Sequence, residues 1–144
     1  MRYWALAGIA ATAVALANCS DSIAPETLLG TWDATELRFT NLANSSQTID
    51  IVQAGGTFTI TLAADSTYEA TITAPGMPDD VTSGTWVYTS LDGLTLTDTG
   101  GDATDINVVS LSGDTMVISS TDGITFDFGA GDVSVRLDGT LVRQ

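Results

Sequence analysis

The chain has 144 residues and a formal net charge of −14 at pH 7, because 18 acidic residues face four basic residues and no histidine. Nucleic acids and anionic lipid headgroups bind to basic surfaces, so we expect no nucleic-acid partner. The length suits a single domain.

The first 18 residues have the features of a secretory signal peptide. Arg2 is followed by an uncharged, mainly apolar segment from Tyr3 to Ala17. A basic start before an apolar segment of roughly 7 to 15 residues is typical of export signals. The segment is also short for the roughly 20 residues that span a bilayer. We therefore leave residues 1–18 out of the fold prediction.

The residues at the end of this segment predict whether the mature protein is attached to a membrane. Leu16-Ala17-Asn18-Cys19 resembles the lipobox, at which lipoprotein signal peptidase cuts before a cysteine that becomes lipid-modified, although Asn18 stands where Gly, Ala or Ser is usual. Cys19 is the only cysteine of the chain. We expect lipidation at Cys19, a polar tether over residues 19–27, and a place in the bacterial cell envelope. Ser20 after the cysteine suggests the outer membrane.

A second cleavage site keeps another outcome open. Ala15-Leu16-Ala17 also matches the A-x-A pattern of ordinary signal peptidase. Cleavage after Ala17 would release a soluble periplasmic or secreted protein with a free thiol. In either case three arginines remain against all 18 acidic residues, so the mature chain has a net charge of −15.

From Gly30 onward, apolar residues recur at every second position, which is the period of a strand with one buried face. Phe58, Ile60 and Leu62 share one face, and threonines occupy the other. The same alternation marks residues 68–72, 86–88, 94–96, 106–108, 116–118, 124–128 and 133–137. Trp32 is out of phase with Leu37, so we expect a bulge in the first strand.

Turn-forming residues separate these runs, at 64–66, 92–93, 100–101, 113–114, 122–123, 129–131 and 138–139. Such short loops exclude parallel strands, which need crossovers of about a dozen residues or more. We predict an all-β fold, an eight-stranded antiparallel meander closed into a small barrel over residues 28–144. The longer segment 40–56 is predicted to carry a short strand or a lid near Ile49-Asp50-Ile51-Val52.

Three motifs, in this order, resemble the lipocalin-like domain of bacterial lipoproteins. Gly30-Thr31-Trp32 opens the first strand, a hairpin follows from Phe58 to Tyr68, and Gly84-Thr85-Trp86 comes later. The resemblance implies a lipocalin-like barrel over about residues 28–144. It also implies that Trp32 closes one end and that Arg143, or alternatively Arg136, packs across it in a cation–π contact.

The chemistry-bearing residues point away from catalysis. The chain has neither histidine nor lysine, and its cysteine is assigned to the anchor. Paired carboxylates such as Asp79 and Asp80 are the only candidates left, so we predict that the protein is not an enzyme and needs no cofactor. Asp98, Asp102 and Asp105 offer oxygen ligands suited to Ca²⁺, but their spacing differs from an EF-hand loop. Solvated turn aspartates are the alternative, and we assign no metal site.

Two functions fit the predicted barrel. The first is an envelope-anchored binding module for a small apolar ligand; the second is an accessory lipoprotein whose packed barrel contacts other envelope proteins. The inward-facing apolar residues decide between them, since they either line a cavity or fill the interior. These residues are Phe58, Ile60, Tyr68, Ile72, Trp86, Tyr88, Phe126 and Phe128.

Overall fold

The computed structural model of the chain describes residues 22–89 and 93–144. The predicted signal peptide, its two cleavage sites and Cys19 lie outside these residues. Within them the chain is built of strands, with one short 3-10 helix, η1 (Pro25–Leu28), before the first strand. In this part of the chain no helix has the length and apolar character needed to cross a membrane.

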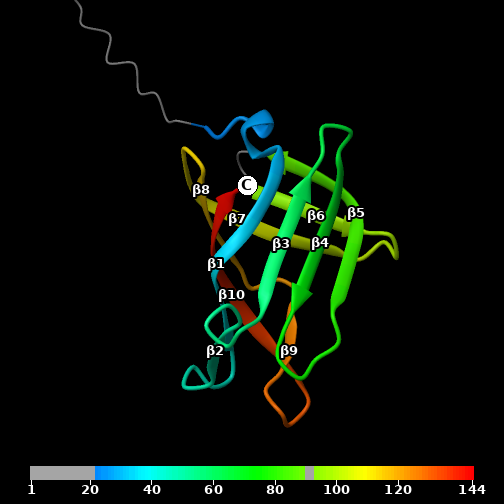
Figure 1. The fold of residues 1–144 in the computed structure, drawn as a ribbon. Coiled ribbons are helices and arrows are strands. Elements are labelled where there is room, and N and C mark those ends of the chain that lie inside the picture. Colours follow the sequence, from blue (N-terminus) through cyan, green and yellow to red (C-terminus); the bar gives the residue numbers. More distant parts are fainter. Residues whose placement is uncertain (1–21, 90–92) are drawn as a thin grey trace, which may run out of the picture.

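Eight antiparallel strands close into a barrel, which confirms the predicted architecture (Figure 1). Each barrel strand pairs with its neighbours in the order β1, β3, β4, β5, β6, β7, β8, β10, and β10 returns to pair with β1. The strands are β1 (Gly30–Asn41), β2 (Thr48–Asp50), β3 (Thr57–Leu62), β4 (Thr67–Thr73), β5 (Asp80–Thr89), β6 (Gly93–Asp98), β7 (Ala103–Ser112), β8 (Thr115–Ser120), β9 (Thr125–Asp127) and β10 (Asp132–Arg143).

The alternation along the sequence sets which side of the barrel wall each residue faces. Ile60 is opposite Ala70 and Leu62 is opposite Tyr68 in the β3–β4 register, and directly opposed residues share one face of a sheet. Ile60 and Leu62 are only 3% and 1% exposed, and the intervening threonines lie on the outer wall. The buried face of every barrel strand contributes to one continuous hydrophobic core.

The bulge expected in β1 is present. The register between β1 and β10 shifts between Ala34 and Glu36. One extra residue in a strand reverses which side chains face inward beyond it. Trp32, Leu37 and Phe39 can therefore all lie in the core despite their spacing, and none of them is more than 5% exposed.

The turn predicted at Asp138-Gly139 is wrong, because both residues lie inside β10. Gly139 serves packing rather than chain reversal. A Cβ atom there would lie 3.0 Å from Cγ1 of Ile118 and 3.2 Å from Cδ1 of Leu37. Glycine within a strand often marks such a close approach of neighbouring groups.

The alternation at 124–128 predicts a strand, and the structure has one there, but outside the barrel ring. The run forms only the three-residue strand β9, whose one partner is the first part of β10, with Phe126 opposite Val133. The second part of β10 pairs with β8, so β9 lies beyond the closed ring of eight strands. At the corresponding place on β1, the predicted short strand in segment 40–56 is present as β2.

Candidate functional site

One end of the barrel is sealed by η1 and two long side chains. The indole Nε1 of Trp32 donates a hydrogen bond of 2.8 Å to the carbonyl of Leu28, and both residues are fully buried. The guanidinium carbon of Arg143 lies 4.3 Å from the Trp32 ring centroid, so the cation–π contact implied by the resemblance is present. Arg143 also donates to the carbonyls of Thr27 and Leu29.

This sealed end includes part of the segment that the sequence assigned to the tether. Ile23 is partly buried and packs against the core, and Pro25 to Leu28 form η1. The folded part of the protein therefore begins earlier along the chain than residue 28.

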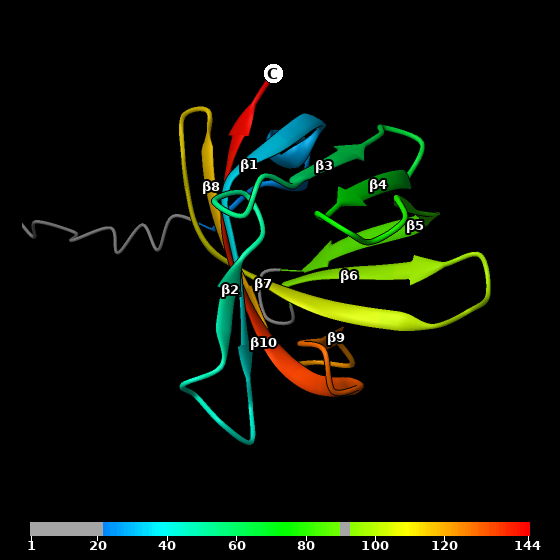
Figure 2. The same cartoon turned by 60° about the horizontal axis from the view of Figure 1, so that its bottom comes forward.

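The opposite end of the barrel, which we call the mouth, is framed by β2, β9 and the loop between β4 and β5 (Figures 1 and 2). The loop is set by a β-turn in which the amide of Met77 donates 3.1 Å to the carbonyl of Ala74. Gly76 has a φ of +79°, as the third position of a type II turn requires after Pro75. The turn leaves Met77 47% exposed at the mouth.

Two adjoining hollows open at the mouth, with volumes of about 230 and 310 Å³. They share Ala74, Met77 and Phe126. The smaller is completed by Phe39, Ile72, Pro78, Asp80 and Thr125, and the larger by Ile49, Ala54, Pro75, Asp127 and Phe128. Most of this lining is apolar, in a protein whose outer wall is rich in threonine.

An aromatic cluster forms the wall of the mouth on the β9 side. The rings of Phe39 and Phe126 stack with their centroids 5.1 Å apart, and Phe128 meets Phe126 edge to face at 5.0 Å. Both geometries are favourable for aromatic pairs. The cluster holds β9 against β1, although these two strands are not hydrogen-bonded neighbours.

The eight residues proposed from the sequence as cavity lining fall into two groups. Ile72, Phe126 and Phe128 line the mouth. The other five line neither hollow: Ile60, Tyr68 and Trp86 are buried at 3 to 7% exposure, and Phe58 and Tyr88 are partly buried against the core. Burial raises the pKa of the Tyr68 hydroxyl, and the Asp98 carboxylate raises it further, so Tyr68 stays neutral near pH 7.

Sequence reasoning missed the loop contribution to the mouth. Met77, Ala74 and Pro75 follow no strand period, and Ile49 and Ala54 lie on or after β2. One sequence feature could have indicated this contribution: Met77 lies between Pro75 and Pro78 in a loop, where an apolar side chain is not expected to pack into the core.

Comparison with models of known protein families shows to which family this chain belongs. The model of the lipocalin-like domain matches residues 28–118, more than half of the chain. The chain belongs to the lipocalin-like domain family. Searches of the curated proteins and of the solved structures found no match.

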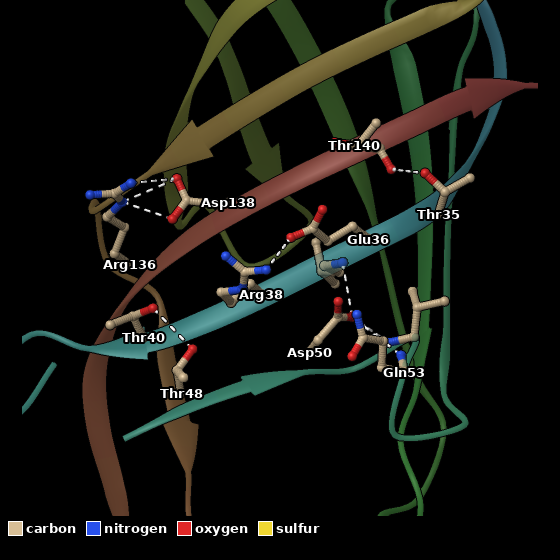
Figure 3. Close-up of polar contacts among 12 residues, drawn as sticks. Thr35, Glu36, Arg38, Thr40, Thr48, Asp50, Gln53, Arg136, Asp138 and Thr140 are labelled. Atoms are coloured by element: carbon tan, nitrogen blue, oxygen red, sulfur yellow. Dashed lines mark hydrogen bonds and ion pairs between the residues drawn. The ribbon is translucent and has the colours of Figure 1, made fainter. Parts of the chain in front are cut away.

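The outer wall of this lipocalin-like barrel carries two of its arginines (Figure 3). Arg38 on β1 pairs with Glu36 at 2.5 Å, and Arg136 on β10 pairs with Asp138 at 2.8 Å. All four side chains are at least 32% exposed, so these ion pairs contribute little to stability. Arg136 thus lies outside the barrel rather than over Trp32.

Asp50, the last residue of β2, stabilises the turn that follows this strand (Figure 3). Its Oδ1 accepts backbone hydrogen bonds from Val52 at 3.0 Å and from Gln53 at 3.3 Å. An aspartate that bonds to the amides following it stabilises a turn. This turn holds Ala54 in place beside the larger hollow.

Two other surfaces of the lipocalin-like barrel are less suited to ligands. A hollow of about 460 Å³ lies over the outer wall of β3 to β5, but more than half of its lining residues are threonine or serine and it has no aromatic cluster. In the aspartate-rich turn between β6 and β7, Asp98 Oδ1 accepts hydrogen bonds from the amides of Gly100 and Asp102. No three acidic side chains in residues 22–89 and 93–144 form a group that could hold a metal.

Proposed function

We propose that this lipocalin-like protein is a non-catalytic binding protein that holds one small apolar molecule in the mouth of its barrel. The observation that carries the proposal is the pair of apolar hollows joined through Met77 and Phe126. Ligand sites are typically hollows of about 300 to 1,000 Å³ with mainly apolar linings and a few polar groups, and the mouth falls at the small end of this range.

The position of the mouth supports the same function. The sealed half of the barrel is filled by side chains such as Leu28, Trp32 and Leu141, none of which has exposed surface. A ligand that entered there would have to displace packed core residues, which costs about 1 to 3 kcal/mol or more. At the mouth, the partly exposed aromatic rings offer apolar surface that binding would remove from water.

We further propose that the protein is anchored in the bacterial envelope through a lipid on Cys19. The support is the lipobox-like sequence and the position of this cysteine after the export signal. Intact mass of the protein purified from cells with detergent tests this proposal. A diacyl or triacyl mass increment located on Cys19 is the expected result, whereas an unmodified chain beginning at Asn18 would show release after Ala17.

Binding at the mouth is testable with N-phenyl-1-naphthylamine, an uncharged probe whose fluorescence rises in apolar sites. The Cys19→Ser variant allows the titration without a lipid or detergent. We expect saturable binding that Met77→Gln weakens roughly fivefold, since this substitution removes apolar contact worth about 1 kcal/mol.

Val87→Gln is the matched control, because Val87 is also exposed, at 60%, but lies on the outer wall of β5. Its affinity for the probe should stay unchanged. No saturable binding, or equal weakening in both variants, would contradict a site at the mouth and favour the accessory role in which a packed barrel contacts other envelope proteins.

A further inference from the structure

The charged side chains that line the two hollows of the mouth are all acidic. Asp80 lines the smaller hollow and Asp127 the larger one. Asp80 is opposite Ile72 in the β4–β5 register, so its side chain projects from the same face of the sheet as an apolar residue of the mouth. Asp132, opposite Asp127 in the β9–β10 register, lies on the same face of this ribbon as Asp127 but lines neither hollow.

The carboxylate of Asp127 is held in a fixed position. Its Oδ1 accepts hydrogen bonds from the amides of Gly129 at 2.6 Å and Gly131 at 2.8 Å. These backbone bonds also lower the pKa of Asp127, so this rim group is charged throughout the physiological range.

In the part of the chain that the structure describes, no basic side chain pairs with these carboxylates. The three arginines of the described residues are all placed and paired elsewhere: Arg143 at the sealed end, and Arg38 and Arg136 on the outer wall. The outer-wall arginines alternate with Phe39 and Leu137, which are buried, so they project from the opposite face of the sheet. Asp80 and Asp127 form no ion pair within residues 22–89 and 93–144.

We infer that the mouth selects apolar molecules that carry a positive charge, such as a hydrocarbon chain or ring bearing an ammonium group, and rejects carboxylate amphiphiles. This inference rests on the proposed binding function of the mouth. The cationic group would lie at the rim near Asp80 and Asp127, and the apolar part would contact Met77 and the aromatic cluster. The faces of Phe126 and Phe128 add a weak attraction for cations of the same kind.

The test compares three ligands with the same ten-carbon chain and different polar groups: decyltrimethylammonium, 1-decanol and decanoate. Each displaces N-phenyl-1-naphthylamine from the Cys19→Ser variant at concentrations below micelle formation. Exposed charge pairs correspond to about two- to fivefold in affinity for each carboxylate. We therefore expect the ammonium compound to bind roughly tenfold more tightly than decanol, and decanoate to bind more weakly than either.

The outcomes separate the two proposals. Equal affinity for all three ligands, or tightest binding of decanoate, would overturn the charge preference while the bound probe still supported a site at the mouth. Failure of the probe to bind the protein at all would overturn the binding function and this inference with it.

The high net negative charge of the chain could attract cations to any part of the surface, so the rim is tested separately. The double variant Asp80→Asn/Asp127→Asn should lose most of the preference for the ammonium compound over decanoate. The control Glu69→Gln/Asp102→Asn removes the same charge from exposed positions on β4 and in the β6–β7 turn and should retain the preference. An equal loss in both double variants would assign the effect to net charge and overturn the inference.

Discussion

Replacing Arg143 by methionine tests how strongly the sealed end stabilises the barrel. The substitution keeps an apolar stem but removes the cation over Trp32 and the hydrogen bonds to the carbonyls of Thr27 and Leu29. The cation–π contact is worth about 0.5 to 2 kcal/mol, and hydrogen bonds from a charged, mostly buried donor add about 1 kcal/mol or more each. The pair with Asp114 adds little, because that carboxylate is 81% exposed.

The expected loss is therefore about 3 kcal/mol in the free energy of unfolding, or roughly 12 °C in Tm for a domain of this size. Urea unfolding of the Cys19→Ser variant, followed by tryptophan fluorescence, measures it. Arg136→Met is the matched control: Arg136 is 57% exposed and pairs with the partly exposed Asp138, so its loss should stay below about 1 kcal/mol. If Arg143→Met lowered the free energy of unfolding no more than Arg136→Met does, the contacts of Arg143 at the sealed end would not stabilise the barrel.

Three further predictions concern the rest of the barrel. Gly139→Ala should lower the free energy of unfolding by about 1 to 3 kcal/mol in urea titrations, because the new methyl group would crowd Ile118; an unchanged midpoint would show that the wall yields easily there. Phe126→Ala removes the stacking on Phe39 and should speed amide hydrogen exchange in β9 while the eight barrel strands keep their protection; uniform loss of protection would contradict a separate role for β9. The lowered pKa of Asp127 means that its contribution to stability is complete above its ordinary value of 3.8 and declines as the pH falls through the lower folded value; Asp127→Asn should therefore flatten the fall in urea midpoint at acid pH, and an unaltered slope would count against this.

The barrel could be predicted because its strands obey one local rule. Alternation such as that of Phe58, Ile60 and Leu62 needs no knowledge of the rest of the chain, since the pleat alone sends alternate side chains to opposite faces. The bulge in β1 was predictable for the same reason, because Trp32 broke the period set by Leu37. The G-x-W motif then placed Trp32 at an end of the barrel.

The errors came from residues whose role depends on distant partners. Gly139 resembles a turn glycine in its local sequence, and only the positions of Ile118 and Leu37 across the barrel show that it makes room for packing. The alternation at 124–128 is genuine, but the length of β10 determines that Phe126 pairs beyond the barrel ring. Met77 is placed at the mouth by the turn from Ala74 to Met77, and the alternation of strand residues does not predict the positions of turn residues.

The sealed end and the mouth lie at opposite ends of β1. If Cys19 is acylated as we propose, this polarity would set the orientation of the barrel relative to the bilayer. With Cys19 acylated, the chain from that residue to η1 reaches at most about 20 Å, so η1 and Trp32 would stay near the headgroups. From Gly30 to Phe39, β1 then carries the chain up to about 30 Å outward to the mouth. A molecule arriving there would come through the aqueous compartment rather than directly out of the supporting leaflet, so the protein would work as a receptor held out from the membrane.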